Sequence, residues 1–568
     1  MKNHPLYNAP TFVNVREIVS YVEENYGDMV ACSFRTNPHK TRIHTRTYAR
    51  LAEDVRCIAT AAVEHGFVAG GHCAIIGKLT YGWICTYLAL LSVGAVIVPL
   101  DPDWSAEDLA DTVKKAECTT LFCNDDVFAK KAQTICEVAG IKNVVTIDYA
   151  ASDCTLNSLL LEGMQLRANG NNVFETARIN PDKLALLVFT SGTTGKGKGV
   201  MLNQTAITSN VTGAMRLINI PIGQRTIGVL PPHHTYGSTV GILAVMMFGS
   251  NMYLSSGVRY VVKELKEHKP YFMVLVPLYL ETFYRKIKAA LSDSGKDKLV
   301  NGMMKVTGPL SKIGIDLRAK LYKSVLAAFG GELKIVVSGG APLAGEIADT
   351  FEAFGLTIIN GYGITECAPL LAANRTCQQV KGSVGYPIPG TRIIIKNPDK
   401  NLEGEICAKG PNVMLGYYKD EEATAAAFDE NGYFRTGDIG KIDENGWLYI
   451  TGREKNLIIL SNGKNVYPEE IEVELSAVPG VIDVVVYEGQ SRRGTEHNAI
   501  VAEIYPDAEF LEKNHIEDKQ EYFKKFVNDF NRNAVAYKKI SVLKVRETEF
   551  PKNTLRKIMR FQIDKTID

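Results

Sequence analysis

Short apolar runs rich in β-branched residues alternate with helical patterns through most of the chain. Runs of this kind between polar segments predict buried parallel strands that are joined by crossover helices. The expected strands are His72–Ile76, Ala95–Val98, Thr119–Cys123, Val144–Ile147, Leu184–Phe189, Thr226–Leu230, Phe272–Val276 and Leu333–Val337. The pattern indicates an α/β fold in which helices sandwich parallel-rich sheets, with ligands beyond the carboxyl ends of the strands. Residues Ala151–Ile179 are expected to form a polar connection.

The alternation gives way to a different pattern near Arg453. Beyond it the sequence predicts two strands and two helices, which are Asn456–Leu460, Val481–Tyr487, Glu469–Leu475 and Lys513–Asn531. A chain of 568 residues is also too long for a single hydrophobic core. We therefore predict a large N-terminal domain of several subdomains, residues 1–453, and a small α+β C-terminal domain, residues 454–568.

One uncharged stretch, Trp83–Leu100, is nearly long enough to span a bilayer. Gly94 and Pro99 interrupt it, and a buried helix followed by a buried parallel strand has the same hydropathy. We favour the buried helix and strand and predict no membrane span. The chain shows no basic amphipathic anchor, and peripheral contact with a membrane stays an open alternative.

Composition and charge narrow the class of partner. The chain carries 64 basic and 63 acidic residues, which gives no electrostatic case for nucleic acid. Its eleven cysteines form no CxxC pair and no metal-ligand spacing with histidine, which is typical of reduced thiols in a reducing compartment. Because the first ten residues lack the apolar region of a secretory signal, a cytoplasmic location is expected.

The most informative stretch runs from Leu186 to Leu202, where an apolar strand enters a glycine-rich loop. Its glycines present backbone N–H groups to an anion, while hydroxyl and ammonium groups add further donors, as a polyphosphate requires. Gly192–Lys198 fits the start of a Walker-type loop, but Gly199 stands where that loop needs Ser or Thr for magnesium. The alternative, a flexible surface turn, does not require a buried strand before it or a cluster of hydroxyls.

The loop sequence TSGTTGKGKG resembles the signature loop of the adenylate-forming superfamily, which includes acyl-CoA synthetases, peptide-synthetase adenylation domains and luciferases. The family usually has proline where this chain has Gly197, a departure expected to loosen the loop. The resemblance implies that the loop holds nucleotide phosphates, with Thr193 also a metal ligand. The implied phosphate-binding residues are Thr190, Ser191, Gly192, Thr193, Thr194, Gly195 and Lys198.

Three further motifs follow in the order that the family has them. LPPHHTYG at 230–237 resembles the family's histidine segment beside the acyl site, and His234 aligns best with its catalytic histidine. VSGGAPL at 337–343 and NGYGITECAP at 360–369 resemble the segments around adenine. The resemblance implies that Tyr362 stacks on adenine, Thr365 contacts the α-phosphate and Glu366 binds magnesium, a hard cation that prefers oxygen ligands. The other implied nucleotide contacts are Gly340, Ala341, Pro342, Gly361 and Gly363.

The C-terminal motifs extend the resemblance to almost the whole chain. Residues 433–472 resemble two fused motifs in which Asp438 accepts the ribose hydroxyls, as an acceptor-only carboxylate can, and Arg453 holds the sugar or the phosphates. Lys455 corresponds to the hinge about which the mobile C-terminal domain rotates, and Gly463 lies in the loop that lines the thiol tunnel. PKNTLRKIMR at 551–560 resembles the motif of the catalytic lysine, implied here to be Lys557, although Arg556 replaces its usual glycine and Lys552 is close in sequence.

The resemblance implies an enzyme that uses ATP and Mg²⁺ to convert a carboxylic acid to its acyl-adenylate, and then coenzyme A to form the acyl-CoA. Val274–Ile287 and the extra helical region Ser311–Phe329 look like long-chain acyl-CoA synthetases, which favours a medium- or long-chain fatty acid. The expected acyl pocket consists of Tyr236, Gly237, Val240, Val276 and Cys367. An aryl or alicyclic acid and a stand-alone enzyme that loads a carrier protein are the alternatives; a luciferase-like oxygenase and a non-catalytic nucleotide-binding protein are disfavoured.

Overall fold

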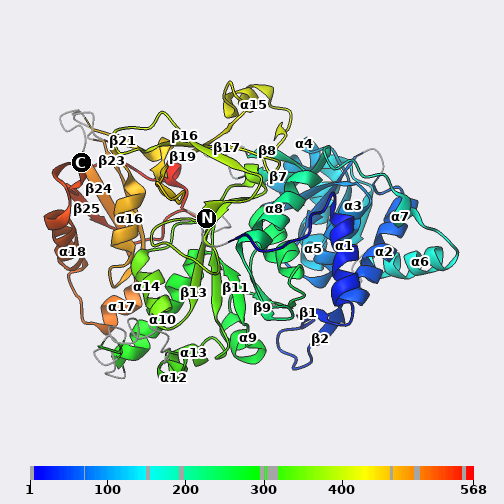
Figure 1. Ribbon diagram of the computed structural model, residues 1–568, viewed down its shortest axis with the longest axis horizontal. Coiled ribbons are helices and arrows are strands. Elements are labelled where there is room, and N and C mark those ends of the chain that lie inside the picture. The colour runs from blue at the N-terminus through cyan, green and yellow to red at the C-terminus, as the bar shows by residue number, and fades with distance from the viewer. Residues whose placement is uncertain are drawn as a thin grey trace.

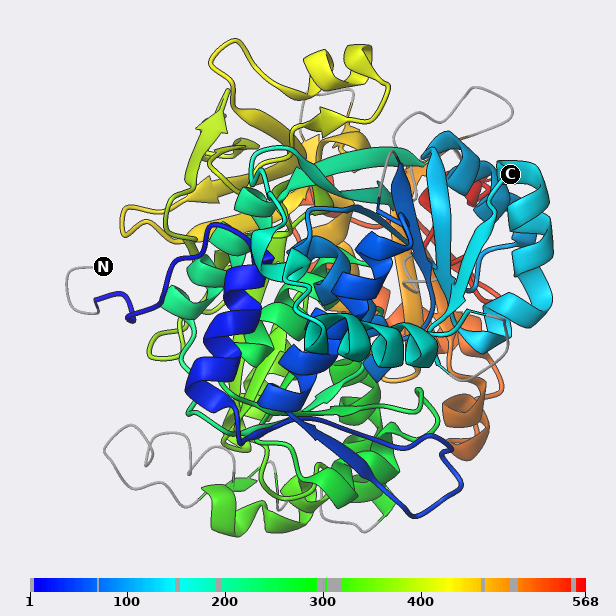
Figure 2. The ribbon, with the colours of Figure 1, turned by 90° about the vertical axis from the view of Figure 1, so that its right-hand side faces the viewer.

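The structure of the protein is a computed structural model. It describes residues 5–68, 71–148, 154–190, 197–293, 300, 302–303, 318–460, 465–490, 499–552 and 558–567. Figure 1 shows a large α/β part, coloured blue to yellow, and a smaller orange and red part at one end of the longest axis. In Figure 2 the blue and cyan elements face the viewer, and the orange and red elements lie behind them.

A seven-stranded sheet carries the strands on both sides of the glycine-rich loop. In sheet order its strands are β18 (Gly416–Tyr417), β8 (Lys198–Asn203), β7 (Leu184–Thr190), β4 (Val96–Leu100), β3 (His72–Ile76), β5 (Cys118–Cys123) and β6 (Asn143–Thr146). The strands from β7 to β6 are parallel, whereas β8 runs antiparallel to β7 and to β18. The carboxyl ends of β4 and β7 and the start of β8 therefore lie at the same end of the sheet.

Both faces of this sheet are buried, because successive side chains of a strand point to opposite faces. In β3, Cys73 and Ile75 pack into one core with α2 (Tyr48–Glu64) and α3 (Tyr81–Ser92). Ala74 and Ile76 pack into a second core with α4 (Ala106–Lys115) and α5 (Asp125–Ala139). Burial on both faces explains why these strands appear in the sequence as continuous apolar runs.

A second layer of sheets extends the large part of the chain. A five-stranded sheet has the order β11 (Phe272–Leu275), β12 (Ile335–Ser338), β13 (Thr357–Gly363), β14 (Leu370–Ala373), β15 (Tyr386–Pro387). A four-stranded sheet has the order β2 (His44–Thr47), β1 (Val30–Phe34), β10 (Asn251–Leu254), β9 (Arg225–Gly228). The helices in this stretch of the chain are α8 (Gln204–Leu217), η1 (Tyr236–Ala244), α9 (Val261–His268), α10 (Pro277–Asp293), α12 (Arg318–Leu321), α13 (Lys323–Ala327) and α14 (Gly345–Ala353).

A fourth sheet precedes the C-terminal part in the chain. It is antiparallel, with the order β16 (Arg392–Lys396), β17 (Gly404–Lys409), β19 (Phe434–Ile442), β20 (Leu448–Arg453), and α15 (Glu421–Ala427) precedes β19. The last residue of β20, Arg453, is paired in register with Asp438 of β19. This pairing places two predicted nucleotide contacts beside each other.

The C-terminal part has its own hydrophobic cores. Its elements are β21 (Ile458–Ile459), β22 (Asn465–Val466), α16 (Pro468–Ser476), β23 (Val481–Gly489), β24 (Ala499–Pro506), α17 (Ala508–Lys513), α18 (Lys519–Asn533), η4 (Ala536–Lys538), β25 (Val542–Val545) and η5 (Arg560–Gln562). Val484 and Val486 of β23 pack with Phe523 of α18, while Val485 and Tyr487 face the other side of the sheet. Such separate cores are typical of a unit that folds by itself.

The structure confirms the eight predicted strands of the large part, each within three residues at either end, and with them the α/β fold. The predicted polar connection Ala151–Ile179 is wrong, because α6 (Leu156–Ala168) and α7 (Val173–Thr176) lie within it. The helix predicted over Lys513–Asn531 corresponds to α18, but α18 begins only at Lys519, where Asp518 caps its start, and Lys513 is the last residue of α17. Of Ser311–Phe329, residues 311–317 lie outside the described residues, and α12 and α13 lie in the rest.

The uncharged stretch Trp83–Leu100 forms most of α3 and then β4, as predicted. Gly94 between them has a φ of +80°, in the left-handed region that glycine enters without strain. All α3 residues from Gly82 to Ser92 are buried inside the protein. No helix in the described parts of the chain has both the length and the apolar character needed to cross a membrane.

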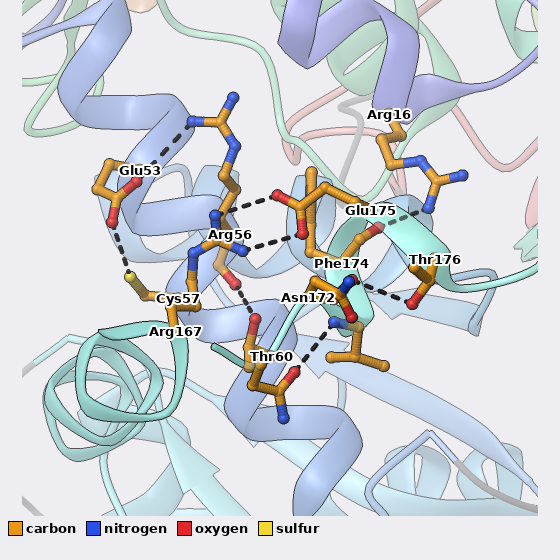
Figure 3. A network of polar contacts seen from close by, with 12 residues as sticks. Arg16, Glu53, Arg56, Cys57, Thr60, Arg167, Asn172, Phe174, Glu175 and Thr176 are labelled. Carbon is orange, nitrogen blue, oxygen red and sulfur yellow. Dashed lines mark hydrogen bonds and ion pairs between the residues drawn. The ribbon is translucent and has the colours of Figure 1, made fainter. Parts of the chain in front are cut away.

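A polar network joins three helical segments near the N-terminus (Figure 3). Arg16 of α1 (Val15–Tyr26) donates to the carbonyls of Phe174 and Ala177 at 2.5 and 3.0 Å. Arg167 of α6 donates to both carboxylate oxygens of Glu175 in α7, at 3.2 and 3.0 Å. A bidentate pair fixes orientation as well as distance, so the network holds α7 between α1 and α6.

The contact between α2 and α6 depends on Gly163. A Cβ atom at this position would lie 1.9 Å from the Cys57 carbonyl oxygen, which belongs to helix backbone. We expect Gly163→Ala to reduce the free energy of unfolding by about 1–3 kcal/mol, measured by chemical denaturation. Gly345→Ala at the start of α14 is the control, because the nearest atom to its new Cβ would be Lys381 Cε at 3.8 Å. Equal stability of the two variants would contradict the close approach.

Candidate active site

A short turn between β13 and β14 carries Thr365 and Glu366. The turn is the 3₁₀ helix η2 (Thr365–Cys367), and the backbone carbonyls of Cys367 and Leu370 face the protein interior. Asn210 of α8 donates from Nδ2 to both carbonyls at 3.0 Å and accepts the Leu370 N–H at 3.0 Å. Asn412, which is fully buried, donates to the same two carbonyls at 3.3 and 3.1 Å. These two amides hold the turn in place.

The carboxylate of Glu366 is oriented by the segment before α15. The Met414 N–H donates to the Glu366 carbonyl at 2.8 Å, and the Tyr417 hydroxyl donates to Glu366 Oε1 at 3.0 Å. No described residue gives a hydrogen bond to the second oxygen, Oε2. A carboxylate held on one oxygen fits the needs of Mg²⁺, which takes one or two carboxylates together with substrate phosphates. Thr193, the other predicted metal ligand, lies outside the described residues.

The two ends of the glycine-rich loop meet at the edge of the seven-stranded sheet. Thr190 ends β7 and Lys198 begins β8, and the two residues are paired in register. Lys198 is exposed, and its Nζ lies 4.6 Å from the centre of the Tyr417 ring. The predicted phosphate contacts between these ends, namely Ser191, Gly192, Thr193, Thr194 and Gly195, lie outside the described residues.

Gly197 replaces the usual proline of the family and lies against the backbone of β7. A Cβ atom there would be 2.4 Å from the Thr190 carbonyl oxygen, too close for any side chain without a backbone shift. Lys115 Nζ reaches the Gly197 carbonyl at 3.5 Å. Glycine therefore suits the close approach of the chain at this position, whereas the loosening that we expected from it stays untested.

Tyr362, Asp438 and Arg453 form a compact group. The Tyr362 hydroxyl donates to Asp438 Oδ2 at 2.7 Å, and Arg453 Nε lies 3.0 Å from Asp438 Oδ1. Asp438 is 2% exposed, and these two contacts give each of its oxygens a partner inside the protein. Burial, and secondarily the Asp438 charge, raise the pKa of Tyr362 well above its ordinary value. Ribose binding to Asp438 requires these contacts to open or to share the remaining lone pairs of the carboxylate.

The predicted adenine segments lie at the ends of two neighbouring strands. Gly340, Ala341 and Pro342 follow β12 and are exposed, while Gly361 and Gly363 belong to β13. Gly340 has a φ of +85°, which favours glycine. A side chain at Gly363 is excluded, because its Cβ would lie 2.1 Å from the Pro369 carbonyl oxygen. The segment after β12 is therefore exposed, whereas the end of β13 at Gly363 is tightly packed.

The two adjacent histidines differ in their surroundings. His233 is buried, and its Nε2 lies 3.3 Å from Asp101 Oδ2, just beyond the end of β4. His234 is partly exposed, and its carbonyl accepts the Ser238 N–H at 2.9 Å. Asp101, His233 and His234 offer ligand atoms within 4.8 Å of one another, but this mixed nitrogen and oxygen set is less suited to Mg²⁺ than carboxylates are. The role of His234 beside the acyl site stays a prediction.

The predicted acyl-pocket residues only partly come together. Gly237 lines a cavity of about 10 Å³, room for about one water molecule, together with Leu230, Gly241 and Val274. Tyr236 donates to the carbonyls of Leu275 and Val337 at 3.0 and 3.3 Å, which joins the ends of β11 and β12. Val240, Val276 and Cys367 do not line this cavity, and Cys367 is completely buried beside Glu366.

Only some of the predicted functional residues near the C-terminus belong to the described residues. Lys455 lies in the short helix η3 (Glu454–Asn456) directly after β20 and is exposed. Gly463 and Lys557 lie outside the described residues. Lys552 has a side chain that is 6% exposed, with its Nζ 2.7 Å from Asp483 and 2.8 Å from Glu549.

Sequence reasoning missed four residues that shape this site: Asp101, Asn210, Asn412 and Tyr417. Asp101 could have been noticed as a carboxylate directly after a buried strand, whereas Asn210 does not stand out among the other polar residues of α8. Nothing in the local sequence indicates that Tyr417 reaches Glu366, because the contact crosses 51 residues.

Comparison with known proteins gives a consistent result. Residues 21–418 match the family described as "AMP-binding enzyme". The long-chain-fatty-acid–CoA ligase FadD15 of Mycobacterium bovis is 31% identical over 458 residues, which cover 78% of this chain and 74% of that protein. The chloroplastic long-chain-fatty-acid–[acyl-carrier-protein] ligase AEE15 of Arabidopsis thaliana is 27% identical over 547 residues, with coverage of 83% and 74%. The fold is shared with ATP-bound MatB from Rhodopseudomonas palustris, at a TM-score of 0.73 and 23% identity over 96% of this chain and 97% of that one.

The shared clamp of Asn210 and Asn412 predicts a non-additive effect on stability. Asn412→Ala removes one of two donors to the Cys367 and Leu370 carbonyls and is expected to cost about 1–3 kcal/mol of unfolding free energy. The double variant with Asn210→Ala leaves both carbonyls without a side-chain donor and should lose more than the sum of the single variants. Denaturant unfolding measures these losses, with the exposed Asn445→Ala as the control. Strict additivity would rule out a shared clamp.

Proposed function

We infer that this chain, which belongs to the family of AMP-binding enzymes, is an ATP-dependent acid–thiol ligase that forms an acyl-adenylate and then an acyl-CoA. In the first half-reaction the substrate carboxylate attacks the α-phosphorus of ATP and pyrophosphate leaves. In the second, the thiol sulfur of coenzyme A attacks the acyl carbon and AMP leaves. The protein contributes mainly by positioning the reactants and stabilising charge.

One observation carries this proposal: polar residues from distant segments meet around the turn that carries Glu366. Burial, and after it the charges of Glu366 and Asp438, raise the pKa of the Cys367 thiol in this turn well above its ordinary value. Glu366 in turn contacts Tyr417 beneath Lys198, and Asp438 contacts Tyr362 and Arg453. Groups suited to phosphate, cation and ribose are therefore neighbours, as one bound nucleotide would require.

Each residue of the site has a proposed role. Thr190 and Lys198 hold the phosphates, Glu366 holds Mg²⁺, and Asp438 with Arg453 holds the ribose. Mg²⁺, when bound, supplies positive charge for the leaving pyrophosphate. Thr365 contacts the α-phosphate, and His234 lies at the entrance to the acyl site. The loop 191–195 and Lys557 complete the set.

A fatty acid of medium or long chain is the proposed substrate. Support comes from FadD15 and AEE15, because both are named as ligases of long-chain fatty acids. The cavity beside Gly237 is apolar but holds only about 10 Å³, so an acyl chain must open it. Because AEE15 is named as an acyl-carrier-protein ligase, a carrier protein is the second candidate for the final acceptor of the acyl group.

We propose residues 1–453 and 454–568 as the two domains, with Lys455 as the hinge. The separate cores around Val486 and Val485 support this division, since each contains only residues from the C-terminal part. Rotation about the hinge would bring either Lys557 or Gly463 to the nucleotide site. A cytoplasmic location is proposed as well, because no disulfide is formed by the eleven cysteines, all of which belong to the described residues.

Lys557 is proposed over Lys552 as the catalytic lysine. The ammonium group of Lys552 is buried between Asp483 and Glu549 and is needed there, because its removal would leave Asp483 without this partner. Lys552→Ala should therefore lower the melting temperature, whereas Lys557→Ala should leave it close to the wild-type value. A catalytic defect of Lys552→Ala without loss of stability would reverse this assignment.

Pyrophosphate release across a panel of acids tests the function. With ATP, Mg²⁺ and a fatty acid, we expect turnover that coenzyme A completes with acyl-CoA as the product. Lys557→Ala should lower kcat/KM at least about 100-fold, because it removes a charge that is matched to the transition state. Lys565→Ala, an exposed lysine of the same segment, is the matched control and should retain activity.

The same assay separates the alternatives. Turnover on aromatic acids alone would keep the chemistry and replace the substrate. Adenylate that coenzyme A cannot discharge, but a carrier protein can, would favour carrier loading. No pyrophosphate release with any acid, despite ATP binding, would refute the proposed function.

A further inference from the structure

Tyr417 connects two groups of the nucleotide site that lie on different segments. Its hydroxyl donates to Glu366 Oε1 at 3.0 Å, and its ring lies beneath the Lys198 ammonium, with 4.6 Å from Nζ to the ring centre. Glu366 follows β13, Lys198 begins β8, and Tyr417 belongs to β18. One side chain is therefore in contact with both the predicted cation ligand and a predicted phosphate ligand.

The backbone around Tyr417 is held rigidly. Tyr417 is paired with Val200 and Gly416 with Met201, so β18 forms an edge of the seven-stranded sheet. The Tyr417 N–H also donates to Thr424 Oγ1 at 2.8 Å, at the start of α15. Because both its strand and its neighbouring helix are fixed, the tyrosine can restrict the groups that it touches.

The chemistry of the two contacts is complementary. A tyrosine hydroxyl that donates to Oε1 selects one orientation of the Glu366 carboxylate and leaves Oε2 directed to other partners. A tyrosine hydroxyl is protonated at neutral pH and can therefore serve as the donor in this contact. The ring face attracts an ammonium group that would otherwise be free to rotate in solvent.

We propose that Tyr417 is a positioning residue that sets the Glu366 carboxylate and the Lys198 ammonium for the magnesium complex of a nucleoside triphosphate. The proposal rests on the function proposed above, in which these two residues hold the metal and the phosphates. Tyr417 itself touches neither substrate nor metal. Its effect should appear as a changed dependence on Mg²⁺ and on ATP, with the protein fold unchanged.

The next residue provides a matched control. Successive side chains of a strand point to opposite faces, and the Tyr418 hydroxyl donates to Glu117 Oε2 at 2.7 Å, away from Glu366. Tyr417→Phe and Tyr418→Phe each remove one hydroxyl that is bonded to one glutamate. Tyr417→Phe keeps the ring under Lys198, and Tyr417→Leu removes the ring as well.

The first measurement is the affinity of each variant for Mg·ATP and Mn·ATP, without any acid present. We expect Tyr417→Phe to weaken metal–ATP binding by about 10-fold, the lower end of what loss of a supporting contact to a metal ligand costs. Tyr417→Leu should lose about a further 3-fold through the ring contact with Lys198. Tyr418→Phe should bind like the wild type, and melting temperatures of the two phenylalanine variants should agree.

The second measurement is pyrophosphate release as a function of Mg²⁺ concentration at saturating acid. Tyr417→Phe should need about 10-fold more Mg²⁺ for half-maximal rate, with kcat largely recovered at high Mg²⁺. Equal metal dependence of Tyr417→Phe and the wild type would overturn the proposal, as would an equal defect in Tyr418→Phe. If the wild type binds Mg·ATP but activates no acid, the proposed function fails, whereas the binding data still decide the role of Tyr417.

Discussion

The turn that carries Glu366 leads into a buried stretch, Cys367–Leu370, so the carbonyl groups of Cys367 and Leu370 need donors from the protein itself. Asn210 and Asn412 meet this need together, since both donate to the carbonyls of Cys367 and Leu370. Asn210 belongs to α8, which follows β8 directly, and Asn412 comes shortly before β18. The carboxylate is thereby fixed relative to the sheet that presents the phosphate-binding loop, and the other contacts of the site build on that placement.

The strands were predictable because burial on both faces leaves a continuous apolar run in the sequence. The same reasoning failed for Ala151–Ile179, where α6 exposes Leu161 and Met164 and so lacks a clean polar stripe. It also placed the start of α18 too early, because the polar and charged residues before its cap, Asp518, resemble those of the helix itself. The order of apolar and polar residues thus identifies strands that are buried on both faces better than helices that expose some of their apolar side chains.

The site was predictable to the extent that it lies at strand ends. Tyr362 and Asp438 lie beside each other, but no pattern in the sequence shows that the hydroxyl of one bonds the carboxylate of the other. Tyr417 escaped prediction for a related reason. Its contact with Glu366 depends on a strand of two residues, β18, whose partner β8 is chosen by the tertiary fold. Polar pairs across distant segments carry no periodicity and can be found only in three dimensions.

The boundary between the two proposed domains is mostly polar where the described residues meet. Arg285 of α10 donates to the Val481 carbonyl at 3.3 Å, and Glu281 lies close to Asp483 and Lys552, with its pKa raised by burial. Among the described hydrophobic residues of the C-terminal part, Val473 is the one that packs, partly buried, against the core around α10. Polar contacts of this kind can be exchanged for water at little net cost in free energy. Rotation about Lys455 would therefore leave the cores of both domains intact, which is the physical requirement for one chain to serve two half-reactions.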